Sequence, residues 1–254
     1  VLGLSLFGYG VRVVKWDLFL GRLGVRLPPV ESAIVFCAGM VMSITPGKVG
    51  EVLKSFLLRE SRGIPVARTA PIVLAERLTD FLALLLLAAY GVAVSGYGRG
   101  VLVAAAVLSV GLLAVLASPR LSHALLRVLA RLPGVGRLAG VLEEAYDSMT
   151  RLIGPRVLLA TTALSVVAWG AEALGTWVLL GAFEGTTADL GTATFVYAFG
   201  TIAGALSMLP GGMLATEGSM VALLHEVFHV TPTVQVATAA TLLIRFCTLW
   251  FGVA

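Results

Sequence analysis

Two short stretches, one in each half of the chain, place charged residues just after helix-breaking residues. The first is Thr45-Pro46-Gly47-Lys48-Val49-Gly50-Glu51, and the second is Leu209-Pro210-Gly211-Gly212 followed by Glu217. Proline suits the first position of a helix, whose unpaired N–H groups favour an anion, and glycine lets a ligand approach the backbone. We therefore expect each proline to start a half-helix. A lipid phosphate would bind at the first one, next to Lys48.

Further charges follow each stretch inside apolar sequence. Lys54, Glu76, Arg77 and Asp80 follow the first stretch, Arg245 follows the second, and Glu172 lies between the two stretches. Glu76 and Asp80 share a helix face because they are four residues apart. Charges at membrane depth are costly and usually face a cavity or each other, so both a packing role and a polar site stay open. The candidate site residues are Thr45, Gly47, Lys48, Gly50, Glu51, Glu76, Arg77, Asp80, Pro210, Gly211, Gly212, Glu217 and Arg245.

The stretch His225-Glu226-Val227-Phe228-His229 matches the zinc motif H-E-x-x-H. On a helix the two histidines would share a face and bind zinc, and Glu226 would act as general base. A catalytic zinc site needs three protein ligands, whereas the remaining histidine, His123, lies in a distant part of the sequence. We predict no metal and no cofactor. An intramembrane zinc protease that uses His225, Glu226 and His229 stays as an alternative.

Composition indicates that membrane helices position these residues. Of the chain, 58% is hydrophobic and 13% is charged, about half the charged fraction of a soluble domain. Uncharged blocks cover residues 81–94, 100–119, 157–171 and 190–216. They approach or exceed the roughly 20 residues that a helix needs to cross a bilayer. Backbone groups in lipid must be paired within their own segment, so we predict an all-α integral membrane protein, a polytopic bundle in one domain.

Basic residues predict the topology of this bundle. They gather in three connections, near 12–26, 59–68 and 120–156, whereas the connections at 96–100, 183–190 and 225–233 contain one, Arg99. Lys and Arg mark cytoplasmic loops. Segment 27–58 should therefore begin and end in the cytoplasm, and segment 189–228 should begin and end outside.

Two re-entrant hairpins in an inverted repeat satisfy this topology. The first repeat would cover about 27–95 and the second about 189–254, with an amphipathic cytoplasmic connection at about 120–154. Inverted repeats with broken helices are typical of transporters whose site lies near the bilayer midplane. The sequence opens in mid-helix without a methionine, so we expect the N-terminus to be incomplete.

These motifs resemble the lysylphosphatidylglycerol synthase transmembrane family, also called flippase-like, which includes the membrane domain of the multiple peptide resistance factor. The resemblance runs from about Arg12 to the end and rests on T-P-G-x-x-G-E, E-R-x-x-D and L-P-G-G. It implies movement of a lipid between leaflets, an aminoacylated phosphatidylglycerol or a polyprenyl-phosphate glycan lipid. Residues 213–217 depart from the glycine- and arginine-containing run that the resemblance leads us to expect. We do not carry over the aminoacyl transfer of fused members.

We therefore expect a multi-pass lipid flippase of the bacterial inner membrane rather than an enzyme. Its substrate would be an anionic or aminoacylated phospholipid or a polyprenyl-phosphate lipid. Lys48, Arg77 and Arg245 would hold the phosphate. The acidic candidates would balance these cations and could bind a cationic headgroup or a coupling proton.

Two further functions stay open, a scaffold and a membrane-embedded lipid-modifying transferase that uses Glu76 and Asp80 as acid and base. The expected partners are membrane lipids and no nucleic acid. The sequence leaves open both a homo-oligomer and a separate lipid-synthesis partner.

Overall fold

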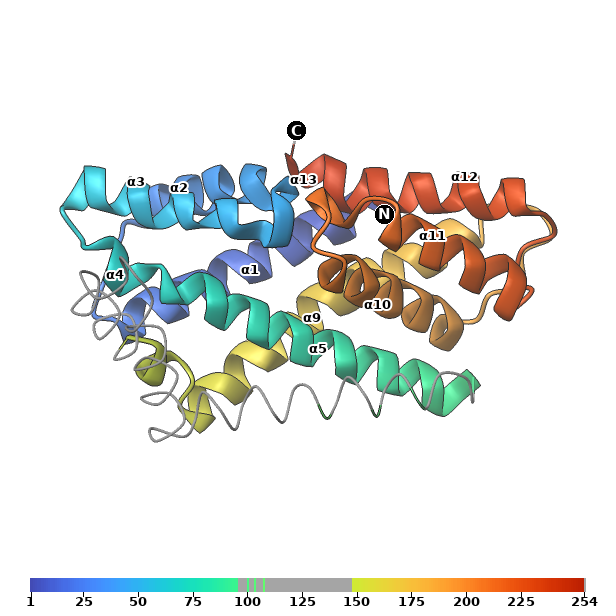
Figure 1. Ribbon diagram of the computed structural model, residues 1–254, viewed down its shortest axis with the longest axis horizontal. Coiled ribbons are helices and arrows are strands. Elements are labelled where there is room, and N and C mark those ends of the chain that lie inside the picture. Colours follow the sequence, from blue (N-terminus) through green and yellow to red (C-terminus); the bar gives the residue numbers. More distant parts are fainter. Residues whose placement is uncertain (96–99, 101–102, 104–106, 108–147, 254) are drawn as a thin grey trace, which may run out of the picture.

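The computed structural model describes residues 1–95, 100, 103, 107 and 148–253 (Figure 1). All regular structure in this part is helical, which confirms the predicted all-α class. Most of the uncharged block at 100–119 and most of the predicted connection at 120–154 lie outside the described residues. The α-helices are α1 (Leu2–Arg22), α2 (Pro29–Val41), α3 (Leu53–Arg62), α4 (Val66–Thr69), α5 (Pro71–Ser95), α9 (Pro155–Leu180), α10 (Leu190–Leu206), α11 (Ala215–Ala222), α12 (Val234–Arg245) and α13 (Phe251–Val253). The 3-10 segments are η1 (Met42–Ile44), η2 (Pro46–Val52) and η4 (Pro210–Gly212), and the π-helical segments are η5 (Leu223–Val227) and η6 (Phe246–Trp250).

Two helices in the described part are long and apolar enough to cross a membrane by length and composition. They cover Pro155–Leu180 and Val234–Val253. Large apolar side chains also point outward from several helices, among them Leu86, Leu159 and Leu242. Apolar surface of this extent is unfavourable in water, and it suits contact with lipid.

Small residues bring the central helices close together. α1 packs along α9, and α5 packs on both α9 and α10. A Cβ atom on Gly91 of α5 would lie 2.5 Å from the Phe195 Cβ and 2.9 Å from the Gly191 carbonyl oxygen of α10. Packing of small residues is the main way that helices associate in lipid, where the hydrophobic effect does not hold them together.

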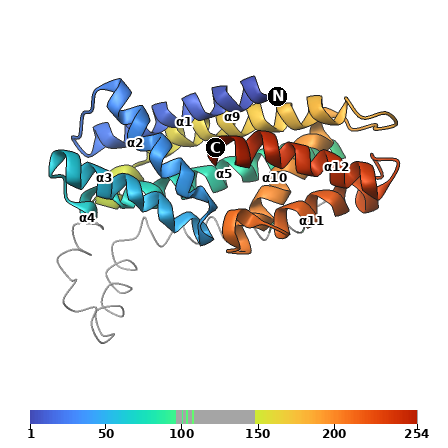
Figure 2. The same cartoon turned by 90° about the horizontal axis from the view of Figure 1, so that it is seen from above.

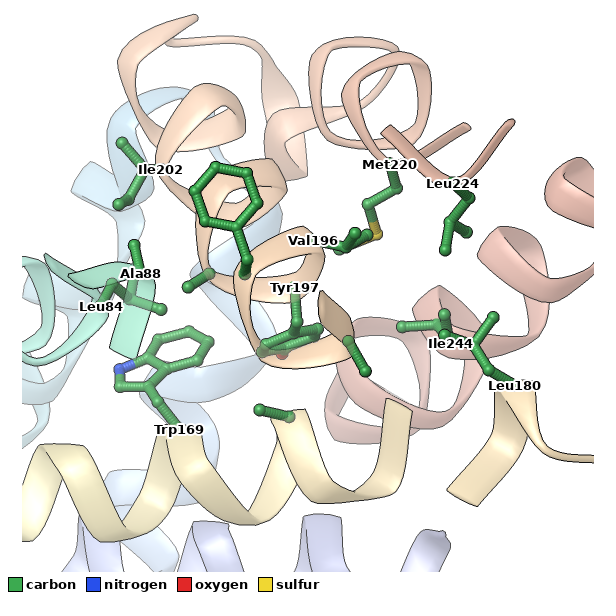
Figure 3. Close-up of a cluster of buried hydrophobic side chains, with 14 of the residues drawn as sticks. Leu84, Ala88, Trp169, Leu180, Val196, Tyr197, Ile202, Met220, Leu224 and Ile244 are labelled. Atoms are coloured by element: carbon green, nitrogen blue, oxygen red, sulfur yellow. The ribbon is translucent and has the colours of Figure 1, made fainter. Parts of the chain in front are cut away.

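Two apolar clusters fill the spaces between helices. One joins α5, α9, α10, α11 and α12, with Leu84, Val196, Met220 and Ile244 among its buried members (Figure 3). The other surrounds Trp16 on α1 and reaches α2 and α3. The charged residues described below lie among these same helices, so their surroundings are close-packed and largely apolar.

Two helical hairpins approach each other from opposite ends of the long axis. α2 and α3 form one, α10 and α11 form the other, and both views place their turns side by side (Figures 1 and 2). The turns are in contact, because a Cβ atom on Gly211 would lie 3.5 Å from Ile44 Cγ1. The Pro-Gly stretches of the two halves are therefore neighbours in space.

Neither turn leads directly into an α-helix. The predicted helix start at Pro46 is confirmed, but η2 is a 3-10 helix, and α3 begins at Leu53. The Thr45 hydroxyl accepts a hydrogen bond from the Gly50 N–H at 2.8 Å. The predicted helix start at Pro210 is wrong. α11 begins at Ala215, because Gly211, Gly212 and Leu214 have φ values of +59°, +67° and +67°, in the left-handed region.

Replacement of Gly91 tests the close approach of α5 and α10. Gly91→Ala should lower the stability of the detergent-solubilised protein by about 1–3 kcal/mol, because backbone atoms of α10 cannot yield to the added methyl group. Thermal unfolding followed by circular dichroism measures the effect. Gly170→Ala in α9 is the control, since its nearest neighbour would be 4.0 Å away. Equal stability of the two variants would contradict this packing.

Candidate functional site

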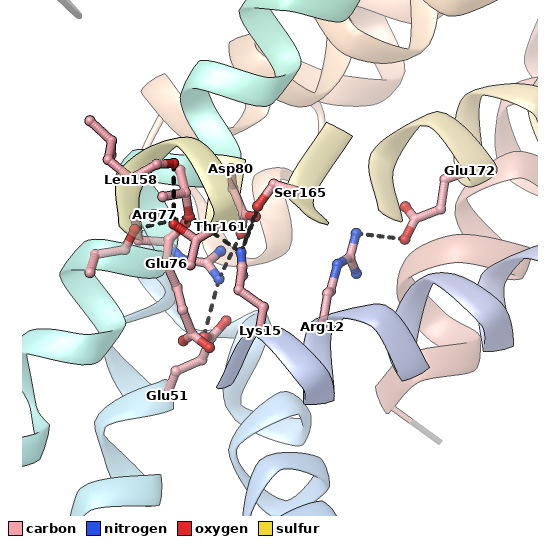
Figure 4. Close-up of polar contacts among 12 residues, drawn as sticks. Arg12, Lys15, Glu51, Glu76, Arg77, Asp80, Leu158, Thr161, Ser165 and Glu172 are labelled. Atoms are coloured by element: carbon pink, nitrogen blue, oxygen red, sulfur yellow. Dashed lines mark hydrogen bonds and ion pairs between the residues drawn. The ribbon is translucent and has the colours of Figure 1, made fainter. Parts of the chain in front are cut away.

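A buried ion pair joins three helices at the centre of the described part. Lys15 of α1 donates to Asp80 of α5 at 2.6 Å and to Ser165 of α9 at 2.8 Å (Figure 4). Ser165 in turn donates to Asp80 at 2.9 Å. A charge-assisted hydrogen bond of this kind contributes more than a neutral one, and loss of one partner would leave a buried charge.

Arg77 extends this pair to the first hairpin. Its guanidinium lies 3.2 Å from Asp80 and 3.3 Å from Glu51. Lys54 of α3 lies 3.6 Å from Glu51 and donates to Glu76 at 2.6 Å. Charges of alternating sign thus run from α1 through α5 to the hairpin (Figure 4). We call this set the first-half network; its members are Lys15, Glu51, Lys54, Glu76, Arg77 and Asp80.

The accessible part of the first-half network is cationic. The side chain of Arg77 is 30% exposed, whereas those of its partners Glu51 and Asp80 are 6% and 7% exposed. A ligand that reaches the network therefore meets a guanidinium before a carboxylate. Such a surface favours an anion.

Lys48 lies beside the network with no carboxylate within ion-pairing distance among the described residues. It occupies η2 with a φ of 57°. Its Nζ is 5.7 Å from the ring centroid of Trp169, and the Arg12 guanidinium lies 4.1 Å from the same centroid. Cations over an indole ring gain about 0.5–2 kcal/mol, less than a full ionic partner provides in a buried site.

Glu172 connects Arg12 to the second half. Arg12 donates to Glu172 at 2.7 Å, and the Tyr197 hydroxyl donates to the other oxygen of the same carboxylate. The three side chains come from α1, α9 and α10. One carboxylate thus ties together three helices, and Figure 4 shows the Arg12–Glu172 pair apart from the first-half network.

The second hairpin carries its own ion pair. Arg245 of α12 donates to Glu217 of α11 at 2.6 Å and to the Gly211 carbonyl of η4 at 2.5 Å. The guanidinium therefore fixes the turn against two helices. Its charge is matched by one carboxylate.

The family model described as Lysylphosphatidylglycerol synthase TM region matches residues 1–254. The chain belongs to this family. The match covers every residue, confirms the resemblance drawn from the motifs, and with the two apolar helices identifies a membrane protein. The chain has no significant match among the curated proteins or the solved structures compared with it.

The structure of this family member divides the candidate residues into two groups. Lys48, Glu51, Glu76, Arg77 and Asp80 lie together around the first-half network. Pro210, Gly211, Gly212, Glu217 and Arg245 surround the second turn. The three cations predicted to hold the phosphate are thus divided between the groups, Lys48 and Arg77 in the first and Arg245 in the second, and a phosphate that all three share stays a prediction.

The glycines of the two turns contact protein. Gly47 lies in η2 next to Lys48. A Cβ atom on Gly50 would lie 2.7 Å from the Thr45 side chain, and one on Gly212 would lie 3.0 Å from the Gly204 Cα. Gly50 and Gly212 therefore have a packing role besides any role in binding.

Sequence analysis missed several residues that surround the network. Arg12 and Lys15 were predicted in a connection between helices, and this is wrong, because both lie within α1 and pair with Glu172 and Asp80. Their three-residue spacing and the neighbouring Trp16 match one face of a helix and could have revealed them. Lys54 and Glu172 were recognised as charges within apolar sequence but were not among the candidate site residues. The missed residues that carry no local signal are Ser165, Trp169 and Tyr197.

The H-E-x-x-H stretch lacks the helix that a zinc site of this type requires. The π-helical segment η5 ends at Val227, and His229 has a φ of 50°. His225 instead lies 3.3 Å from the Thr231 carbonyl oxygen. No group of three His, Cys, Asp or Glu residues in the described part is arranged to hold a metal ion. The zinc protease is therefore not supported by the geometry.

Removal of the Asp80 carboxylate tests the buried pair. Asp80→Asn should destabilise the protein by roughly 3–5 kcal/mol, because Lys15 would stay buried without an anion. The double variant Lys15→Met, Asp80→Asn should recover part of this loss in a thermal unfolding assay. Glu226→Gln, at an exposed carboxylate, is the control. A double variant no more stable than Asp80→Asn alone would contradict the pairing.

Proposed function

We propose that this family member is a multi-pass transporter of the bacterial inner membrane that moves a lipid between leaflets. Its substrate would be an anionic or aminoacylated phospholipid or a polyprenyl-phosphate lipid. The observation that carries the proposal is a charged centre, largely buried, that presents cations beside the contact of the two hairpin turns. Membrane lipids are the proposed partners, with a second copy or a lipid-synthesis protein as additional ones.

The arrangement of the hairpins supports alternating access. In the proposal they enter the membrane from opposite sides as an inverted repeat, and rocking of one repeat against the other opens the centre to each leaflet in turn. The opposed approach of α2–α3 and α10–α11 and the contact between Ile44 and Gly211 support this (Figure 1).

The charges favour transport over lipid modification. A phosphate loses its hydration when it crosses hydrocarbon, and Arg77 and Lys48 would replace part of that stabilisation. A transferase that used Glu76 and Asp80 as acid and base would need these carboxylates at the substrate. Both are buried and bound to lysines, Glu76 to Lys54 and Asp80 to Lys15.

Lipid scrambling in proteoliposomes tests the proposal. Arg77→Gln should slow the movement of labelled phosphatidylglycerol at least about tenfold, because a hydrogen bond to a charged group contributes roughly 1.5–3 kcal/mol. Glu51→Gln should also slow it, because it deprives Arg77 and Lys54 of their shared carboxylate. Lysyl-phosphatidylglycerol and a polyprenyl phosphate are assayed in parallel.

Arg62→Gln is the matched control, since Arg62 forms a solvent-exposed pair with Glu31 away from the network. It should transport like the wild type. Size-exclusion profiles and helical content establish that each variant is folded. Recovery of a covalently changed lipid would show that the protein is an enzyme rather than a transporter. Equal movement with and without protein would exclude scrambling of the three lipids.

A further inference from the structure

At the centre of the described part, cationic side chains outnumber carboxylates. Each carboxylate there has a cation within ion-pairing distance. Lys48, in contrast, has no carboxylate of the described residues within that distance. One positive charge is therefore in excess. The cations are Arg12, Lys15, Lys48, Lys54, Arg77 and Arg245, and the carboxylates are Glu51, Glu76, Asp80, Glu172 and Glu217.

A partly buried charge without a partner is unfavourable, and a bound anion removes this cost. Lys48 lies within electrostatic range of Arg77 and Arg12, and also of Glu51 and Asp80, two carboxylates that are already paired with other cations. The Arg77 side chain is 30% exposed, so a ligand can reach it. An accessible arginine and the excess charge thus belong to one neighbourhood, and one negative charge would make it neutral.

Among the described residues of this neighbourhood, no carboxylate oxygen is both unpaired and accessible to an ammonium group, and the unpaired Glu76 Oε1 is buried. Glu51 and Asp80 already neutralise the cations that they contact and are nearly inaccessible. Glu217 is 22% exposed, but one of its oxygens holds Arg245 and the other is buried. A cationic arm next to Lys48 and Arg77 would meet like charges, which repel it.

We propose that the centre of this chain selects a headgroup with a single phosphodiester charge and no ammonium group. The phosphate contacts Lys48 and Arg77, next to the Trp169 ring that Lys48 and Arg12 both approach. Phosphatidylglycerol has this chemistry, whereas lysyl-phosphatidylglycerol adds two positive charges. The inference rests on the proposed function, because it takes a lipid headgroup as the occupant.

Binding to the detergent-solubilised protein tests the inference separately from transport. Isothermal titration calorimetry with short-chain lipids should give a Kd for phosphatidylglycerol at least about tenfold lower than for lysyl-phosphatidylglycerol or phosphatidylethanolamine. A parallel titration with glycerophosphoglycerol, the headgroup alone, tests whether the site requires a lipid or only a phosphodiester. We expect it to bind more weakly than the lipid, and equal affinity would assign the site to a soluble ligand.

Lys48→Gln should raise the Kd for phosphatidylglycerol about tenfold and abolish the preference, whereas Lys48→Arg should keep it. Arg62→Gln should bind like the wild type. Equal or tighter binding of lysyl-phosphatidylglycerol, or unchanged affinity in a folded Lys48→Gln, would overturn the inference. Selective binding without movement of any lipid would instead refute the proposed transport and leave the selectivity standing.

Discussion

A charge inside hydrocarbon needs an opposite charge within a few ångströms, and this constraint organises the whole molecule. At about 4 Å the attraction between two unit charges is several-fold stronger near a protein than in bulk water. Lys15 of α1 meets this requirement through Asp80 only while α1 stays beside α5, and Ser165 of α9 donates to the same carboxylate. The network therefore acts as a set of cross-links that specify which helices are neighbours.

Helix packing and charge pairing support each other in this fold. Gly91 lets α5 lie against α10. Gly8 likewise lets α1 lie against α9, because a Cβ atom on Gly8 would lie 3.1 Å from the Ala168 carbonyl oxygen. Such close approaches bring side chains of modest length within hydrogen-bonding distance. Arg12 on α1 thereby reaches Glu172 on α9 at 2.7 Å. A wider helix spacing would separate the charges and leave each one without a partner.

The two hairpins have the same type of turn but differ in the ion pairs around it. Each has a Pro-Gly turn, and each turn is held by an arginine from a later helix. Arg77 has two carboxylate partners and stays partly exposed, whereas Arg245 has one carboxylate and the Gly211 carbonyl. The first half also carries Lys48. This asymmetry is why we propose ligand binding at the first hairpin and a mainly positioning role for Arg245.

Much of the architecture could be predicted from the sequence. Composition and uncharged blocks indicated membrane helices, and the breaks at Pro46 and Pro210 are local signals that need no tertiary information. Glu76, Arg77 and Asp80 were found because they interrupt an apolar helix. Their inclusion in one network with Lys15 was not predictable, since Lys15 is 65 residues from Asp80 and 150 from Ser165.

The errors have physical causes. Arg12 and Lys15 were placed in a connection rather than in a helix, because the count of basic residues ignores which helix face they occupy. The start of α11 was placed at Pro210 because left-handed backbone at Leu214, a residue that rarely adopts it, has no sequence signal. The zinc alternative required the H-E-x-x-H stretch to be a regular α-helix. The structure instead has a π-helical segment followed by left-handed backbone at His229.

A cryo-electron microscopy structure of the protein in nanodiscs that contain phosphatidylglycerol tests the central claim most directly. The account predicts a lipid phosphate within hydrogen-bonding distance of Lys48 Nζ and the Arg77 guanidinium, with the Lys15–Asp80 pair intact. Lipids confined to the outer surface, with Lys48 paired to a carboxylate of the chain, would contradict it.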